Sequence, residues 1–141
     1  MVGHRVEDLV KGWIQRSYLE RDGWWAQLVL DEFAFLDELG FSLVASSWAG
    51  VHFHQKGHYV GFVGPRRDIA VDYDPDDPKR VTIGASLVEH DPPRFVSLDE
   101  VLAEHIPGVE MPRRKPLDRD AVEANVRWWA DGLRQIAPEV L

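Results

Sequence analysis

The chain of 141 residues contains no cysteine. This absence excludes disulfide bonds, cysteine nucleophiles and thiolate metal ligands. It fits a reducing compartment, and we expect the protein to be cytoplasmic. The sequence also lacks any apolar run near the ~18 residues that a membrane span needs. Because its first residues are charged and have no apolar core, we predict no secretory signal either.

Basic residues are few, with 16 Lys and Arg against 24 Asp and Glu, so the formal net charge is −8. Nucleic-acid binding depends on clustered Lys and Arg, and this balance argues against it. An acidic surface favours solubility and attracts a basic partner. Many cytoplasmic proteins are acidic, however, so the charge does not identify a partner by itself. We expect a protein partner, and neither nucleic acid nor a membrane.

The sequence also lacks the common catalytic motifs. It has no G-x-S-x-G, no phosphate-binding glycine loop and no H-E-x-x-H. Without such a motif, no residue set points to a nucleophile, a bound nucleotide or a zinc ion. We therefore expect no cofactor and favour a binding protein over an enzyme.

The spacing of the apolar residues divides the chain into helical and extended parts. Residues 5–20, 24–39 and 122–136 place apolar side chains on one stripe of a helix, and we expect Gly23 to separate the first two. Between residues 41 and 87 the period falls to two, which is typical of strands. The predicted strands are 41–46, 51–55, 58–63, 68–73 and 80–87.

Several residues predict where these elements begin and end. Gly40 stands where a left-handed helix cap belongs. Ser97 opens a capping box, which predicts a short helix over residues 98–105. Asp120 is a candidate cap for the last helix, and we expect Pro138 to end that helix. The segment 90–94, with two prolines, is predicted to be an extended linker.

These elements predict a single α+β domain over residues 1–141, with residues 1–20 as either its first helix or an N-terminal helical arm. We expect one antiparallel sheet of about five strands in a meander. Amphipathic helices from the N- and C-terminal parts of the chain would pack on one face of this sheet. The other face would then remain open or be used in function.

A tight turn at Lys56 and Gly57 would pair the strands 51–55 and 58–63 so that directly opposed residues share a face. One face is then apolar and is assigned to the core, and its residues are Val51, Phe53, Val60, Phe62, Ile69, Val71, Tyr73, Val81, Ile83 and Leu87. The other face is polar with several small residues, and its residues are His52, His54, Tyr59, Gly61, Ala70, Asp72, Arg80, Thr82, Gly84 and Ser86.

The histidines are the first candidates for a metal site. His52, His54 and His58 are close in sequence, and imidazole is the commonest metal ligand. The predicted register places His58 on the opposite face from the other two. Asp72 could be a third ligand, but nothing in the sequence places it beside them. We therefore predict exposed strand histidines and no metal site.

The acidic segment that follows offers a second candidate. Asp72, Asp74 and Asp76 have the spacing that begins a calcium-binding loop. The pattern then fails, because Asp77 stands where the glycine belongs and Ile83 where the bidentate Glu belongs. We interpret the segment as a solvated acidic turn that can meet a basic partner. The predicted partner-binding residues are His52, His54, Tyr59, Asp72, Asp74, Asp76 and Asp77.

In size, acidity and the order helix, five-strand meander, helix, residues 24–136 resemble the small acidic proteins of bacterial toxin–immunity systems and similar bacterial α+β proteins. The resemblance is one of layout and involves no diagnostic motif. It implies a non-enzymatic protein that neutralises a basic toxin or effector by covering its active site.

Two other functions stay open. The first is an acidic protein similar to secretion chaperones, which would be a homodimer. Those chaperones usually place a helix between strands three and four, and the turn at residues 64–67 leaves no room for it. The second is a ligand-binding protein or enzyme that uses the polar sheet face around His52, His54, Tyr59 and Asp72.

Overall fold

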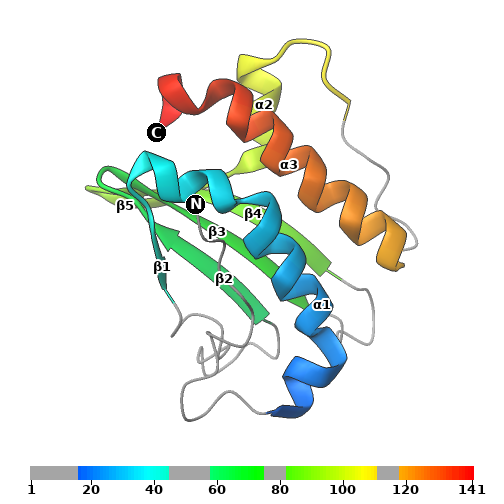
Figure 1. Cartoon of the computed structure of the whole chain (residues 1–141). Coiled ribbons are helices and arrows are strands. Elements are labelled where there is room, and N and C mark those ends of the chain that lie inside the picture. The colour runs from blue at the N-terminus through cyan, green and yellow to red at the C-terminus, as the bar shows by residue number, and fades with distance from the viewer. Residues whose placement is uncertain (1–15, 45–57, 75–81, 111–117) are drawn as a thin grey trace.

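The computed structural model describes residues 16–44, 58–74, 82–110 and 118–141. Five strands form one antiparallel sheet in the order β1-β2-β3-β4-β5, with helices before and after it (Figure 1). The predicted α+β fold is confirmed. The elements are α1 (Arg16–Glu32), the 3-10 helix η2 (Ala34–Leu39), β1 (Ser42–Val44), β2 (His58–Val63), β3 (Arg67–Asp74), β4 (Thr82–His90), β5 (Pro93–Ser97), α2 (Leu98–His105) and α3 (Arg119–Val140).

The sheet follows the predicted meander over most of its length. The strand predicted over residues 58–63 is β2, and those predicted over 68–73 and 80–87 correspond to β3 and β4. The strand predicted over 41–46 contains β1 (Ser42–Val44), and residues 45 and 46 lie outside the described residues. The strand predicted over 51–55 lies outside the described residues. Phe62, which was expected opposite Val51, has Leu43 and Ile69 as its neighbours in the sheet.

The predicted linker at residues 90–94 is wrong. The chain turns at Asp91 and Pro92 and returns as β5, which pairs with β4 from His90↔Pro93 to Ser86↔Ser97. A proline lacks the N–H that a central strand needs, but it is tolerated at the first residue of an edge strand. Pro93 has that position. The prolines therefore shape a hairpin instead of excluding a strand.

The first helix also differs from its prediction. We expected Gly23 to break it, but α1 continues through Gly23 to Glu32. A glycine inside a helix costs about 1 kcal/mol relative to alanine, and burial of the flanking Trp25 and Val29 exceeds that cost. The expected cap is confirmed, since Gly40 has φ 86° and donates its backbone N–H to Asp37 and Leu36.

The C-terminal helix follows the predicted apolar stripe, and all five of its residues are buried: Val122, Val126, Trp129, Leu133 and Ile136. Its cap is Asp118 and not Asp120, because the Asp118 carboxylate accepts a hydrogen bond of 2.8 Å from the Ala121 N–H. Pro138 lies inside the last turn and does not end the helix. A proline there removes one N–H donor, while burial of Val140 keeps the turn helical.

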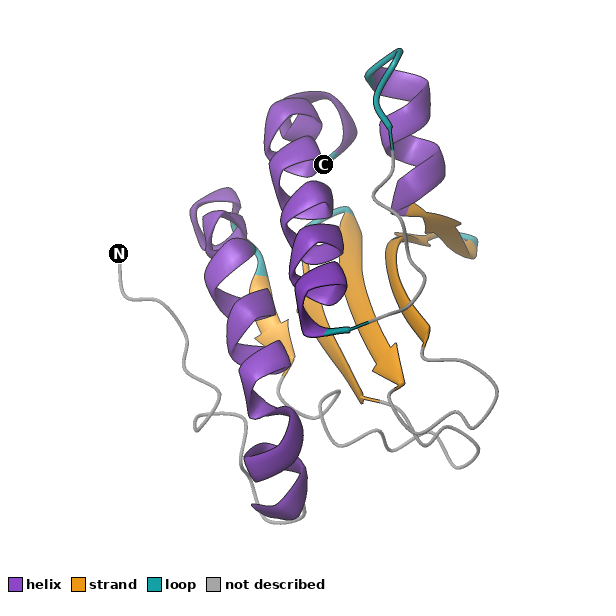
Figure 2. Cartoon of the chain, turned by 90° about the vertical axis from the view of Figure 1, so that its right-hand side faces the viewer, coloured by secondary structure: helices purple, strands orange, loops and turns teal. Residues whose placement is uncertain are grey.

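The helices α1 and α3 lie side by side over one face of the sheet and run in the same direction (Figures 1 and 2). Their buried aromatic residues meet the sheet directly, since the Trp25 ring lies 5.3 Å from that of Tyr73 and the Phe33 ring 5.9 Å from that of Phe62. Ser97 caps α2 by accepting the Asp99 N–H. None of the helices in the described ranges has the length and apolar character needed to cross a bilayer.

Candidate functional site

The sheet face opposite the helices combines an acidic residue with small ones. The strand register aligns Tyr59, Asp72 and Gly84 across β2, β3 and β4. The next row along the sheet contains Gly61, Ala70 and Ser86. These alternate with the buried Val60, Phe62, Ile69 and Val71, so the predicted division into two faces is confirmed for the described strands. We call this second face the open face.

Asp72 has an exposed position in the middle strand of the sheet. Its neighbour Gly84 makes room for it, because a Cβ added at Gly84 would lie 3.0 Å from the Asp72 Oδ1 atom. The carboxylate therefore extends over a backbone that has no side chain of its own. Because Asp72 is carried by a paired strand, the fold fixes where this negative charge stands.

The structure places only part of the predicted site. Asp74 ends β3 two residues after Asp72, opposite Thr82, and so shares its face by register. The register also brings Tyr59 next to Asp72, as predicted. Four predicted residues lie outside the described part of the chain: His52, His54, Asp76 and Asp77.

The histidine prediction can be followed at one position. His58 is the register partner of Tyr73, which is buried on the covered side of the sheet. By its position in the register, His58 therefore belongs to the opposite face of the sheet from Tyr59 and Asp72, as expected. Over the described ranges, no three His, Asp or Glu side chains are grouped as a metal site would require.

The sequence prediction missed an apolar row at the other end of the open face. Val63, Asp68, Val88 and Phe95 are aligned across β2, β3, β4 and β5. Phe95 is 73% exposed and Val63 is 42% exposed. We call Val63, Val88 and Phe95 the apolar strip. The adjacent apolar residues Phe95 and Val96, directly after the predicted linker 90–94, were the available signal.

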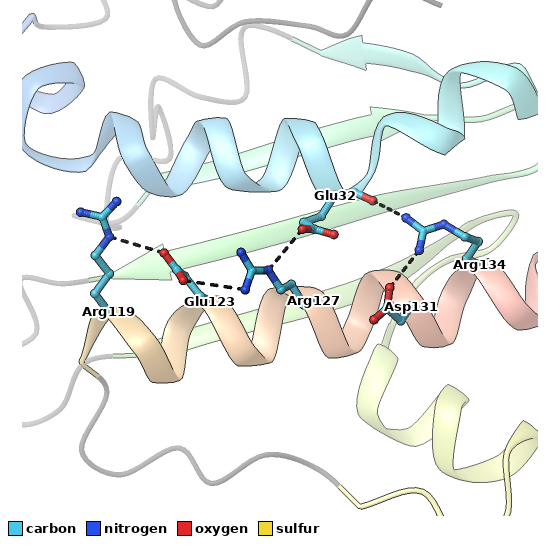
Figure 3. A network of polar contacts seen from close by, with 6 residues as sticks. All are labelled: Glu32, Arg119, Glu123, Arg127, Asp131 and Arg134. Atoms are coloured by element: carbon cyan, nitrogen blue, oxygen red, sulfur yellow. Dashed lines mark hydrogen bonds and ion pairs between the residues drawn. The ribbon is translucent and has the colours of Figure 1, made fainter.

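The outer side of the helical layer also carries charges, and six of these charged residues contact one another (Figure 3). Arg127 contacts Glu32 of α1 at 3.3 Å and Glu123 at 4.0 Å. Arg134 contacts Asp131 at 2.9 Å and donates to the Glu32 carbonyl oxygen. Arg119 lies 3.6 Å from Glu123, which completes this set. We call these six residues the α1–α3 ion-pair network.

Two of these arginines also cover aromatic rings of the first two helical segments. The Arg119 guanidinium lies 4.6 Å from the Trp24 ring centre, and that of Arg134 lies 4.8 Å from the Phe35 ring centre. Such contacts hold α1 and η2 against α3. These six charged residues therefore contribute to the packing of the helices against one another, and the open face is considered as the candidate recognition surface because Asp72 is exposed there.

No family model matches the sequence, and comparisons with curated proteins and with solved structures also give no match. The resemblance to toxin–immunity proteins therefore stays a prediction of layout. The open face has an exposed carboxylate, that of Asp72, at one end and the apolar strip at the other.

Proposed function

We propose that this protein is a non-enzymatic binding protein whose open face receives a basic protein partner, as an immunity-type inhibitor receives a toxin or effector. The observation that carries the proposal is the position of Asp72, exposed on the middle strand and opposite the helical layer. Asp74 follows on the same register, and the chain has a net charge of −8. An acidic face of this kind steers and orients a basic partner.

The shape of the open face supports a protein partner over a small molecule. Its central positions carry Gly61, Ala70, Gly84 and Ser86, so little side-chain volume rises above the strands. Small-molecule sites are usually concave and enclose most of the ligand. A sheet face carried on paired strands instead suits another protein surface, because ordered strands limit the entropy lost on binding.

The layout gives less support to the two alternatives. A ligand-binding protein that encloses its ligand in a barrel would need a closed sheet, whereas β1 and β5 stand at opposite ends of the order of described strands. The secretion-chaperone alternative would place a helix in the sheet connections. The connection between β2 and β3, which are the predicted third and fourth strands, is only residues 64–66, closed by a hydrogen bond of 3.1 Å from Gly64 N–H to the Arg67 carbonyl oxygen. Residues 75–81, between β3 and β4, lie outside the described residues.

Charge reversal at Asp72 tests the proposal. The first partners to screen are the products of neighbouring genes, by two-hybrid assay, with binding then measured by calorimetry. We expect Asp72→Lys to weaken binding by about tenfold or more, and we expect the affinity of the wild-type protein to fall as salt rises. Glu104→Lys is the matched control, because Glu104 is exposed on α2 and the change in charge is the same.

The inhibitory part of the proposal needs a separate measurement. If the partner is toxic when expressed alone, co-expression of the wild-type protein should restore growth and Asp72→Lys should not. A partner whose affinity changes with neither salt nor Asp72 would contradict the proposal. So would an equal loss from Glu104→Lys, because net charge rather than the open face would then account for binding.

A further inference from the structure

The apolar strip exposes large apolar side chains that the proposed contact between Asp72 and a basic partner does not cover. Phe95 is the most exposed of the large apolar side chains in the described ranges, and Val63 is also exposed. The register places both in one row with Val88, so their side chains share the open face across three strands. Single exposed apolar residues are ordinary, but an aligned set on one face marks a contact surface.

The carboxylate of Asp68, the acidic residue in this row, already contacts other residues of the protein. The Asp68 Oδ1 atom accepts a hydrogen bond from Gly64 N–H at 3.2 Å and lies 2.7 Å from the His90 Nε2 atom. These contacts hold the carboxylate to the β2–β3 turn and to the end of β4. What the row offers to another molecule is therefore mainly apolar: Val63, Val88 and Phe95.

We propose that the apolar strip anchors an aromatic or aliphatic side chain of the same basic partner that meets Asp72. This inference rests on the proposed function and adds the chemistry of the partner segment, which must present a cationic group and an apolar group together. Charge complementarity selects this occupant, because a chain of net charge −8 repels a second copy of itself.

The spacing on the sheet fits a single partner. Asp72 and Asp68 are four residues apart on β3, and Phe95 lies two strands beyond Asp68. At about 3.3 Å per residue and about 4.8 Å per strand, the positions of Asp72 and Phe95 are roughly 16 Å apart. An extended peptide covers this distance in about five residues. A standard interface of about 800 Å² per partner spans both ends.

The two ends of the open face then have different kinetic roles. An exposed charge such as Asp72 accelerates association and makes it sensitive to salt. An aromatic side chain buried on binding, as Phe95 would be, slows dissociation. Changing Asp72 should therefore lower mainly the association rate constant, and changing Phe95 should raise mainly the dissociation rate constant.

A peptide titration of the full chain, followed by amide chemical shifts, tests this inference. The main probe carries two arginines and, after about four serine and glycine residues, a tryptophan. One control peptide replaces the tryptophan by serine, and the other replaces the arginines by serine. We expect the main probe to bind at least about fivefold more tightly than either control. The amides of Val63, Val88 and Phe95 should shift only with tryptophan present.

Protein variants then separate the two ends. Phe95→Ser should reduce the main probe to the affinity of the arginine-only peptide, and Val63→Thr is a second variant of the same strip. Leu39→Ser is the matched control, because Leu39 is 44% exposed on η2, outside the open face. Circular dichroism checks that each variant is folded.

The results distinguish this inference from the proposed function. If the arginine-only peptide binds as tightly as the main probe and Phe95→Ser changes neither affinity, the anchor is overturned while the basic-partner proposal stands. If the arginines add nothing, so that the tryptophan-only peptide binds as tightly as the main probe, the basic-partner proposal is overturned, and with it the inference that one partner meets both ends.

Discussion

The two faces of the sheet are built from the same strands, yet one is buried beneath the helices and the other carries exposed residues. On β3, Val71 is buried beneath the helices, while its neighbour Asp72 is exposed on the open face. Successive residues of a strand point to opposite sides, so one strand can supply stability with one residue and recognition with the next. Substitutions on the covered face should therefore change unfolding, and those on the open face should change binding.

The largest effect on stability is expected at Trp129, which is fully buried and donates from its indole Nε1 to Asp99 Oδ1 at 2.6 Å. Trp129→Ala should lower the free energy of unfolding by about 3–5 kcal/mol, through the cavity that it leaves. Chemical denaturation measures this. Trp128→Ala is the adjacent control, because Trp128 is only partly buried. An equal loss from Trp128→Ala would contradict the assignment of Trp129 to the buried side of α3.

Two glycines compare the buried contact between helices with the open face of the sheet. A Cβ at Gly132 would lie 2.7 Å from Leu102, where α3 meets α2, whereas one at Gly84 would meet only the exposed Asp72 side chain. We expect Gly132→Ala to cost about 1–2 kcal/mol, because overpacking exceeds the helix propensity gained. Gly84→Ala should change stability by less than about 0.5 kcal/mol. Thermal unfolding compares the two.

The clash at Gly132 can be checked with a second substitution. Leu102→Ala should cost less when Gly132 is already alanine than in the wild-type protein, because the added methyl group then occupies space that Leu102 has left. Strictly additive losses would contradict the close approach of α2 and α3.

A small effect is also expected from the α1–α3 ion-pair network. Both side chains of the Glu32–Arg127 pair are partly exposed to solvent. A double-mutant cycle with Glu32→Ala and Arg127→Ala should give a coupling energy of about 0.2–1 kcal/mol that decreases as salt is added. A coupling energy that salt leaves unchanged would indicate a buried ion pair and would contradict the assignment of this pair to the solvent-exposed surface.

Much of this architecture was predictable because local patterns agree with the fold. The stripe from Val122 to Ile136 and the alternation through Val60 and Phe62 indicate which sides are buried, and both are confirmed. Gly40 and Ser97 mark real element boundaries. The proline and glycine predictions at Gly23, Pro93 and Pro138 were wrong, because packing or an edge position outweighed the local preference.

The sequence by itself determined the class of the fold, the acidic charge and the parity that sends Val71 inward and Asp72 outward, since these follow from composition and from the period of two. Only the tertiary structure showed that β5 extends the sheet, that Phe95 joins Val63 and Val88 in one row, and that Asp68 is held by Gly64 and His90. The reason is physical: strand neighbours are set by hydrogen bonds between distant segments, which local sequence preferences do not specify.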